Sequence, residues 1–271
     1  MTRRPKVTVR TLREMKRRAE KIVVLTAYDH PTALIEDRCG VDVILVGDSL
    51  GMVVLGYENT LPVTMDEMVH HTRAVARARP RALTVGDMPF MTYQAGVEDA
   101  VRNAGRLVKE GGMEAVKLEG GRRMETAIRA IVDAAIPVMG HIGLTPQSVN
   151  QFGGYRVQGR DPRAAGELVE EAAFLESCGC FAIVLEGMPW PVAQRITAAV
   201  SIPTIGIGAG PHCDGQVLVV NDLLGLNEDF APRFVKRYAE LGRAMSDAFA
   251  AYIDDVRAGR FPDLDHSYPS E

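Results

Sequence analysis

The chain has 271 residues, a formal charge of −4 and 46% hydrophobic residues, a composition ordinary for a globular enzyme. The length exceeds that of most single domains but suits an α/β barrel folded as one domain. The negative charge argues against nucleic acid or an anionic membrane as the principal partner. No apolar run approaches the roughly 18 residues that a membrane span needs.

Residues 1–21 are rich in lysine and arginine but lack the apolar core of a signal peptide. A transit peptide is the alternative to a surface helix. We prefer the helix because apolar residues recur at helical spacing along one face, at Val9, Leu12, Met15, Ala19 and Ile22. The cysteines form no Cys-x-x-Cys pair, so we expect buried free thiols in a cytoplasmic protein; they are Cys39, Cys178, Cys180 and Cys213.

Eight apolar segments then alternate with segments of helical character. We predict strands over residues 22–26, 43–46, 83–87, 115–119, 138–141, 181–186, 204–208 and 216–220. We predict helices over about 31–38, 64–78, 97–110, 122–134, 162–177 and 192–199. This alternation favours a (β/α)8 TIM barrel over a doubly wound sheet.

Beyond the last strand, a helical region is predicted from Pro232, with a loose tail over 259–271. Its apolar stripe indicates core or a subunit interface and comprises Phe234, Tyr238, Leu241, Met245, Phe249, Tyr252 and Val256. The full prediction is therefore one domain over residues 1–271, a barrel with an N-terminal helix and extra C-terminal helices.

Polar side chains follow five of the predicted strands, at Asp48, Asp87, Glu119, His141 and Glu186. Asp48 shares the parity of the strand residues Ile44 and Val46, so we expect these three side chains on one face. In a barrel the carboxyl ends of the strands surround one mouth. All five polar groups would then face a shared space, whereas an open sheet would keep outlying strand ends apart.

Asp48, Asp87 and Glu119 form a candidate metal site. Two ionised carboxylates about 4 Å apart repel by about 4 kcal/mol at an effective dielectric of about 20, and a cation removes that penalty. Oxygen ligands alone favour Mg²⁺, with Mn²⁺ as the second choice. The alternative is that each acid caps a helix or pairs with an arginine.

The remaining polar groups each allow two interpretations. Lys117 lies on the same side of its strand as Glu119, so it either faces a substrate carboxylate or forms a structural ion pair. Glu186 suits a general base, because burial raises a carboxyl pKa, but it also suits a helix cap. Ser49 either caps a helix or donates to a ligand, and His141 is either a ligand donor or a satisfied buried histidine.

Six segments resemble the ketopantoate (3-methyl-2-oxobutanoate) hydroxymethyltransferase family in the same order along the chain. They are Gly-Asp-Ser-Leu-Gly at 47–51, Leu-Pro-Val-Thr at 61–64, Asp-Met-Pro-Phe at 87–90, Val-Lys-Leu-Glu-Gly at 116–120, Gly-His-Ile-Gly-Leu-Thr-Pro-Gln at 140–147 and Gly-Ile-Gly-Ala-Gly at 206–210. The resemblance implies a barrel of the phosphoenolpyruvate mutase and isocitrate lyase superfamily, commonly assembled as a homodecamer.

The resemblance also implies a reaction and a set of site residues. The reaction transfers a hydroxymethyl group from 5,10-methylenetetrahydrofolate to 3-methyl-2-oxobutanoate through a metal-stabilised enolate. The product is 2-dehydropantoate, for pantothenate and coenzyme A synthesis. Mg²⁺ would be held by Asp48, Asp87 and Glu119, and Glu186 would accept the proton. The candidate substrate contacts are Asp48, Ser49, Asp87, Lys117 and His141.

The long connection over residues 144–160 contains Gly153 and Gly154 as a hinge, so we hypothesise that it is a lid. A lyase or mutase of the same superfamily acting on another 2-oxo acid is an alternative function. Such relatives commonly use a cysteine in a mobile loop, and residues 144–160 contain none. A catalytically silent barrel that binds a metabolite is the other alternative, and loss of one of the acids would have supported it.

Overall fold

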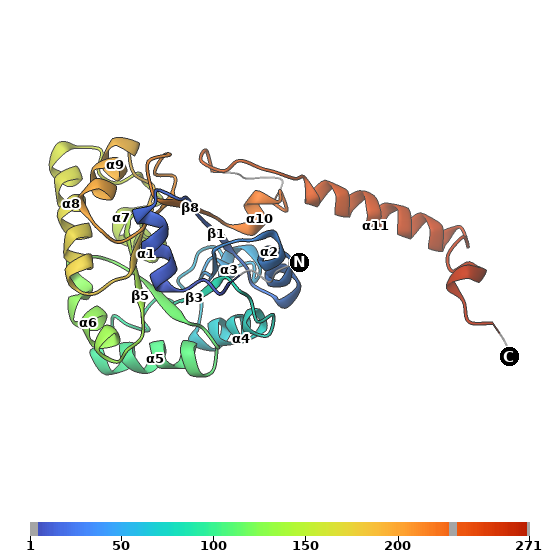
Figure 1. The fold of residues 1–271 in the computed structure, drawn as a ribbon. Helices are drawn as coiled ribbons and strands as arrows, with labels where there is room; N and C mark the ends of the chain where they lie inside the picture. The colour runs from blue at the N-terminus through green and yellow to red at the C-terminus, as the bar shows by residue number, and fades with distance from the viewer. Residues whose placement is uncertain (1–4, 228–231, 270–271) are drawn as a thin grey trace. The chain divides into compact units, whose positions relative to one another are not determined.

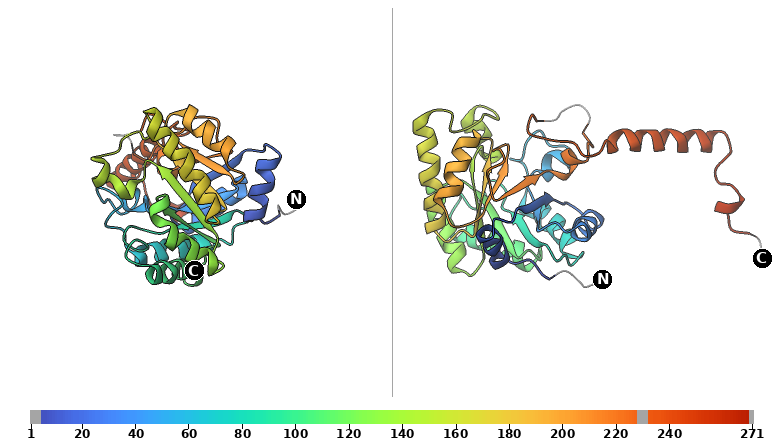
Figure 2. Two further views of the ribbon diagram at one scale, coloured as in Figure 1. Left: turned by 90° about the vertical axis from the view of Figure 1, so that its left-hand side faces the viewer. Right: turned by 45° about the horizontal axis from the view of Figure 1, so that its top comes forward.

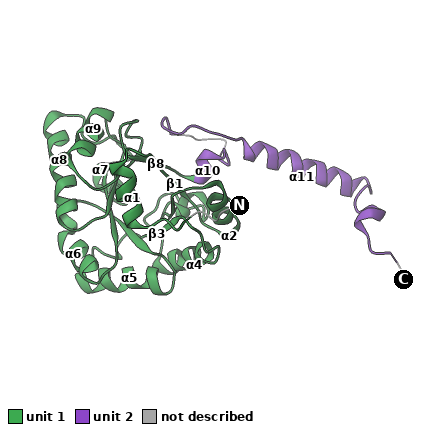
Figure 3. Cartoon of the chain, viewed as in Figure 1, with its two compact units in different colours: residues 1–219 green, residues 220–271 purple. Residues whose placement is uncertain are grey.

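A computed structural model describes residues 5–227 and 232–269 of the chain (Figure 1). It divides into two compact units, Met1–Val219 and Val220–Glu271 (Figure 3). Each unit is described by itself below, and the predicted single domain stays a prediction. Residues 1–4 of the predicted N-terminal segment and residues 270–271 of the predicted tail lie outside the described residues.

The first unit is a closed barrel of eight parallel strands, in which each strand pairs with the next and β8 pairs with β1. This confirms the predicted (β/α)8 fold. The strands are β1 (Ile22–Thr26), β2 (Val43–Val46), β3 (Leu83–Asp87), β4 (Ala115–Glu119), β5 (Val138–Gly143), β6 (Ala182–Glu186), β7 (Thr204–Ile207) and β8 (Gly215–Leu218).

Helices follow the strands and pack around them (Figure 2). In the first unit they are α1 (Val9–Arg17), α2 (His30–Cys39), α3 (Leu50–Val53), α4 (Met65–Ala76), α5 (Val97–Lys109), η1 (Arg122–Met124), α6 (Glu125–Asp133), η2 (Pro146–Ser148), α7 (Val149–Phe152), α8 (Pro162–Ser177) and α9 (Trp190–Ala199). The second unit contains α10 (Val220–Leu223), α11 (Leu241–Arg257) and η3 (Leu264–His266). No helix of the described part of the chain is long and apolar enough to cross a membrane.

Local sequence chemistry sets several helix starts. Thr64 accepts a hydrogen bond from the Glu67 backbone N–H, and the Glu67 carboxylate accepts one from the Thr64 backbone N–H. These two hydrogen bonds form a capping box at the start of α4. Asp161 caps α8 in the same way by accepting from two backbone N–H groups, with Pro162 in the first turn.

Helix α1 closes the N-terminal end of the barrel. The Lys16 ammonium donates to the carbonyl oxygens of Thr197 and Ile202 and lies 2.8 Å from an Asp214 carboxylate oxygen, all of which precede β7 or β8. Leu12 is fully buried and belongs to the same apolar cluster as the inward side chains of the strands. The carboxyl ends of the strands therefore lie at the other end of the barrel.

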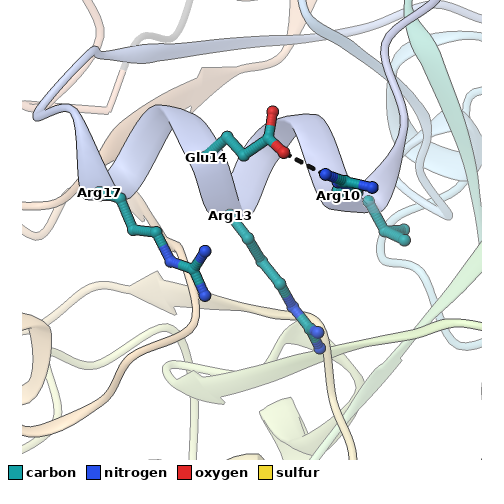
Figure 4. A pocket seen from close by; sticks show the side chains of 5 residues that line it. Arg10, Arg13, Glu14 and Arg17 are labelled. Atoms are coloured by element: carbon teal, nitrogen blue, oxygen red, sulfur yellow. Dashed lines mark hydrogen bonds and ion pairs between the residues drawn. The ribbon is translucent and has the colours of Figure 1, made fainter.

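Helix α1 is shorter than the predicted segment of 1–21. It ends at Arg17, Ala19 adopts a left-handed φ of 53°, and Ile22 already belongs to β1. A basic groove of about 400 Å³ runs along the helix, where Arg10 donates to Glu14 at 2.8 Å beside Arg13 and Arg17 (Figure 4). Because α1 covers the N-terminal ends of the strands, this groove is not part of the strand-end site.

The C-terminal helix also differs from its prediction, because α11 begins at Leu241 rather than near Pro232. Before that point the backbone pairs with the turn after α10. The Tyr238 N–H donates to the Leu223 carbonyl, and the Leu241 N–H donates to the Leu224 carbonyl. The predicted loose tail contains one short helix, η3, which Asp263 caps. The thiols are free as predicted, but Cys39 is exposed rather than buried.

Candidate active site

The register of neighbouring strands places the polar side chains in pairs. Asp87 on β3 lies beside Lys117 on β4. Glu119 on β4 lies beside His141 on β5. Glu186 ends β6 and shares the parity of Ala182 and Val184, which belong to the barrel core. Parallel neighbours in register point to the same face, so these polar groups lie at the C-terminal mouth of the barrel, as predicted.

Asp87 and Lys117 form a buried ion pair. The Lys117 ammonium donates to both Asp87 carboxylate oxygens at 2.7 Å. Burial acts to lower the pKa of Lys117, but the carboxylates of Asp87, Glu119 and Asp48 outweigh it and raise that pKa above its ordinary value. Lys117 is thus a fixed positive charge in the mouth, and the ion pair named as its alternative role is present in this structure.

Asp48 reaches the same space by a different route from the one its parity predicted. Strand β2 ends at Val46. Its residues Val43 and Leu45 belong to the apolar cluster inside the barrel, whereas Ile44 does not. The chain turns at Gly47, and the Asp48 N–H donates to an Asp87 oxygen at 3.4 Å. The expected common face with Ile44 and Val46 is therefore wrong, because the strand period does not extend past the strand.

Gly47 and Ser49 give this turn its close packing. A Cβ added at Gly47 would stand 2.8 Å from the Ser49 hydroxyl oxygen. The Ser49 hydroxyl lies 2.8 Å from the Tyr28 hydroxyl, and it makes no capping hydrogen bond to α3. Of the two roles considered for Ser49, helix capping is therefore absent.

His141 lies between two acids. Its Nε2 is 3.2 Å from a Glu186 oxygen, and its Nδ1 is 3.6 Å from Glu119 Oε1. Neither contact has hydrogen-bond geometry, and both ring nitrogens lack a hydrogen-bond partner among the described residues. Burial, and secondarily the charge of Lys117, lower the pKa of His141 well below its ordinary value. His141 is therefore a neutral ring that faces the mouth, not a satisfied structural histidine.

Glu186 contacts His141 but forms no ion pair with a lysine or an arginine among the described residues. It does not cap the next helix, since the N-cap of α9 is Pro189 and no side chain caps that end. Burial raises the pKa of Glu186 to about 7, and Lys117 opposes the shift. A carboxyl with a pKa near neutrality matches the requirement for a general base.

Two further residues of the site carry no recognisable sequence signal of their own. Gln147 donates from its side-chain nitrogen to an Asp48 oxygen at 2.9 Å and from its backbone N–H to a Glu119 oxygen at 2.9 Å. Tyr93 donates to the Gln147 amide oxygen at 2.7 Å. Gln147 ends the predicted motif 140–147, but an amide can serve many roles, so the motif alone gave no function for it.

Comparison with known proteins gives the family of this chain. The sequence profile described as ketopantoate hydroxymethyltransferase matches residues 6–264. The 3-methyl-2-oxobutanoate hydroxymethyltransferase of Moorella thermoacetica is 60% identical over 268 residues, covering 99% of this chain and 100% of that protein. The protein of that name from Geobacter sulfurreducens is 59% identical over 96% of this chain and 98% of its own length. The chain belongs to the ketopantoate hydroxymethyltransferase family.

Membership in the ketopantoate hydroxymethyltransferase family confirms that the chain is an enzyme, a transferase. Solved structures share the fold of this family member at much lower identity. A phosphoenolpyruvate phosphomutase from Streptomyces platensis has a TM-score of 0.61 at 17% identity, covering 96% of this chain and 92% of that one. A 2,3-dimethylmalate lyase, described as a phosphoenolpyruvate mutase and isocitrate lyase superfamily member, has a TM-score of 0.60 at 18% identity, covering 98% and 93%. These likenesses confirm the predicted superfamily fold.

The three predicted metal ligands of this hydroxymethyltransferase lie in one mouth but are not gathered on a single point. Within residues 5–227 and 232–269, no three His, Cys, Asp or Glu side chains form a ready metal cluster. Each acid instead has an internal donor, Lys117 for Asp87 and Gln147 for Asp48 and Glu119.

The donor set nevertheless fits a hard divalent cation. All three side chains offer oxygen, which suits Mg²⁺. Glu119 Oε1 is buried and has no hydrogen-bond partner among the described residues. Burial raises the pKa of Glu119 well above its ordinary range, and burial followed by the charge of Asp87 raises the pKa of Asp48 to about 7. A cation would satisfy the unpartnered oxygen and remove the cost of keeping these carboxylates ionised.

Proposed function

We propose that this enzyme transfers a hydroxymethyl group from 5,10-methylenetetrahydrofolate to 3-methyl-2-oxobutanoate and forms 2-dehydropantoate. The names of the relatives supply the substrate. The observation that carries the proposal is the buried Lys117 ammonium in the mouth that also holds Glu186. A fixed positive charge in the same mouth as a carboxylate that pairs with no lysine or arginine suits an enzyme that binds an acid and removes a proton from it.

The site residues divide the chemistry among them. Lys117 offsets the negative charge of the oxo acid, and Ser49 and His141 provide short polar contacts to it. Glu186 removes the proton from C3 of the substrate, and the resulting carbanion, delocalised as an enolate, attacks the one-carbon unit of the folate. A carbon–carbon bond forms, and both bonds from that carbon to the two folate nitrogens break. Water supplies the hydroxyl group and one proton, and the proton taken from C3 supplies the second, so each nitrogen gains one proton and Glu186 returns to its ionised form.

Asp48, Asp87 and Glu119 would hold Mg²⁺, which when bound supplies a Lewis acid for the negative charge that develops on the keto oxygen. In the structure the pair of Asp87 with Lys117 already sets a positive charge beside one of these ligands. The chain's own contribution is thus to orient the acid and to keep the proton acceptor Glu186 apart from the metal ligands, with His141 between them.

Residues 149–160 are suited to cover the bound substrate. Gly153 and Gly154 have φ of 64° and 115°, and a Cβ on either would meet no atom within 4 Å. Tyr155, next in the chain, donates to Met52 Sδ at 3.8 Å and is half exposed. We propose that residues 149–158 are the moving part of the predicted lid over 144–160, and that Leu144, Thr145 and Gln147 stay fixed because they are buried.

The proposed setting is a homo-oligomer in the cytoplasm, a decamer by family resemblance, acting on small molecules. The four cysteines are free thiols, which accords with a reducing compartment. Oligomeric assembly would give the C-terminal stripe a partner.

Proton exchange tests the proposed reaction directly. The protein is incubated with 3-methyl-2-oxobutanoate in D₂O, with Mg²⁺ or with a chelator, and the C3 proton is followed by NMR. We expect metal-dependent exchange that Glu186→Gln reduces by at least about 100-fold, in the range that a general base contributes. Glu167→Gln, which changes an exposed glutamate on α8, is the matched control and should exchange normally. No exchange with metal and folate present would instead favour the silent barrel.

A further inference from the structure

Gln147 donates hydrogen bonds to two of the three carboxylates proposed as metal ligands, although no role in the reaction has been assigned to it. Its side-chain nitrogen donates at 2.9 Å to Asp48 Oδ2 and at 2.9 Å to the Met88 carbonyl oxygen. Its backbone N–H donates at 2.9 Å to Glu119 Oε2. The residue is 5% exposed. One buried residue therefore contacts two carboxylates, one just beyond the end of β2 and one at the end of β4, and β3 lies between these strands.

The hydrogen bonds fix which way the amide of Gln147 faces. The amide oxygen lies 2.7 Å from the Tyr93 hydroxyl and 3.3 Å from the side-chain nitrogen of Gln94. Both N–H groups and both oxygen lone pairs are then in use, which is the full capacity of an amide. A flipped amide would place its oxygen against the Asp48 carboxylate and the Met88 carbonyl, which accept but do not donate. The N–H groups must therefore point toward Asp48.

Tyr93 sets this orientation and is itself held at the mouth. Its hydroxyl oxygen accepts from the Glu119 backbone N–H at 3.1 Å. It has one proton to donate, and the closer acceptor is the Gln147 amide oxygen rather than the Glu119 carbonyl at 3.2 Å. The ring is 2% exposed, so the hydroxyl has no access to bulk water. A phenylalanine would keep the ring in place but lose the group that orients the amide.

We infer that Gln147 is a positioning residue of the metal site, which holds Asp48 and Glu119 at a fixed spacing and rotation, with Tyr93 fixing the amide of Gln147. This rests on the proposed Mg²⁺ site. Gln147 takes Oε2 of Glu119 and leaves Oε1, the buried oxygen without a partner, facing the mouth. Its side-chain amide likewise donates to one oxygen of Asp48. Because the amide is neutral, it stabilises the carboxylate without adding a positive charge that would repel the metal ion. Residues that orient ligands in this way commonly contribute 10- to 100-fold to metal affinity.

The test measures metal binding separately from activity. Mn²⁺ binding to the metal-free protein is followed by electron paramagnetic resonance, and thermal unfolding is recorded in EDTA. Gln147→Met keeps the length of the side chain and the backbone N–H but removes the amide, and we expect roughly 10-fold weaker Mn²⁺ binding or more. Tyr93→Phe should weaken binding several-fold. Gln151→Met, in the same loop but exposed, is the matched control and should bind as the unaltered protein does.

A double variant tests that Tyr93 acts through Gln147. In the Gln147→Met background, Tyr93→Phe should change Mn²⁺ affinity by less than about twofold, because the amide it orients is gone. Unchanged Mn²⁺ affinity in a folded Gln147→Met protein would overturn the role. If that variant does not fold, unchanged affinity in Tyr93→Phe would overturn it equally.

The outcomes also separate this inference from the proposed reaction. An unaltered protein that binds no Mn²⁺ would overturn both the metal site and the role of Gln147. Mn²⁺ binding that depends on Gln147, in a protein that exchanges no C3 proton, would support the positioning role while contradicting the proposed reaction. A loss of thermal stability in EDTA without a change in Mn²⁺ affinity would assign Gln147 a purely structural role and overturn the inference.

Discussion

Glu36 on α2 is a buried carboxyl outside the active site. Both of its oxygens lack a hydrogen-bond partner among the described residues, and the residue is 5% exposed. Burial, followed by the nearby charge of Asp29, raises its pKa from 4.5 to about 8. In the unfolded chain the carboxyl ionises near 4.5, so between these two values the unfolded state releases a proton that the folded state retains. Glu36 therefore lowers the free energy of unfolding as pH rises from about 4.5 to 8.

Replacing this carboxyl should remove that pH dependence. Each pKa unit corresponds to about 1.4 kcal/mol, so Glu36→Gln should gain about 2 to 4 kcal/mol of stability relative to the unaltered protein between pH 5 and pH 8. Urea unfolding at both pH values measures the difference. The exposed Glu167→Gln is the control and should follow the unaltered protein. Parallel stability curves for Glu36→Gln and the unaltered protein would show that Glu36 is ionised in the fold.

At the same residue scale, the sequence identified charged groups of the site better than neutral ones. Asp87, Glu119 and Glu186 end regular strands, so a strand period sufficed to place them in the mouth. Gln147 lies beyond β5 in a short helix, and only the folded chain shows that it faces Asp48. An amide has no charge to be compensated, so no electrostatic argument from sequence singles it out.

At the scale of elements, strands were predicted closely because their ends are set by local chemistry. Strands β1, β3 and β4 begin and end where the apolar runs do. The predicted C-terminal helix starts too early, because the apolar spacing continues back to Phe234 whereas α11 begins at Leu241. There the backbone N–H groups of Tyr238 and Leu241 find partners in the α10 turn instead. The spacing of apolar residues indicates which side chains share a face. It does not indicate which carbonyl oxygens will accept the backbone N–H groups.

Helix α11 has an apolar face that its own unit does not bury. Phe249 and Tyr252 are each 59% exposed, and no residue of the helix is buried. Exposed aromatic side chains in a continuous stripe are typical of an interface. We expect another subunit to cover this face, so Phe249→Lys should produce a smaller species in light scattering after size-exclusion chromatography. Ala250→Lys, which adds the same charge to the polar side of α11, should not. An unaltered protein that elutes as a monomer would contradict this expectation.

On the scale of the whole barrel, the two ends have different tasks. Helix α1 closes the N-terminal end with Leu12 in the core and Lys16 bonded to backbone carbonyls. The C-terminal end instead contains Asp48, Asp87, Lys117 and Glu119, all nearly inaccessible to water. Burial raises the pKa values of Asp48 and Glu119, and buried carboxyls of this kind oppose folding at neutral pH. A ligand that compensates those charges should therefore raise the free energy of unfolding.

Mg²⁺ should accordingly stabilise the folded enzyme as a whole. A ligand at 100 times its dissociation constant adds about 2.7 kcal/mol, which corresponds to roughly 5 to 10 °C in melting temperature for a chain of this size. We expect that increase when Mg²⁺ replaces EDTA in the unaltered protein. Asp87→Ala should bind the metal at least about tenfold more weakly and lose most of the increase. The variant should still fold, with a lower melting temperature in EDTA because buried Lys117 loses the carboxylate it donates to, so the Mg²⁺ shift is measured from each protein's own value in EDTA. Normal activity and a normal Mg²⁺ shift in Asp87→Ala would show that Asp87 is not a metal ligand. Deleting a true ligand weakens Mg²⁺ binding, and weaker binding stabilises the folded state less.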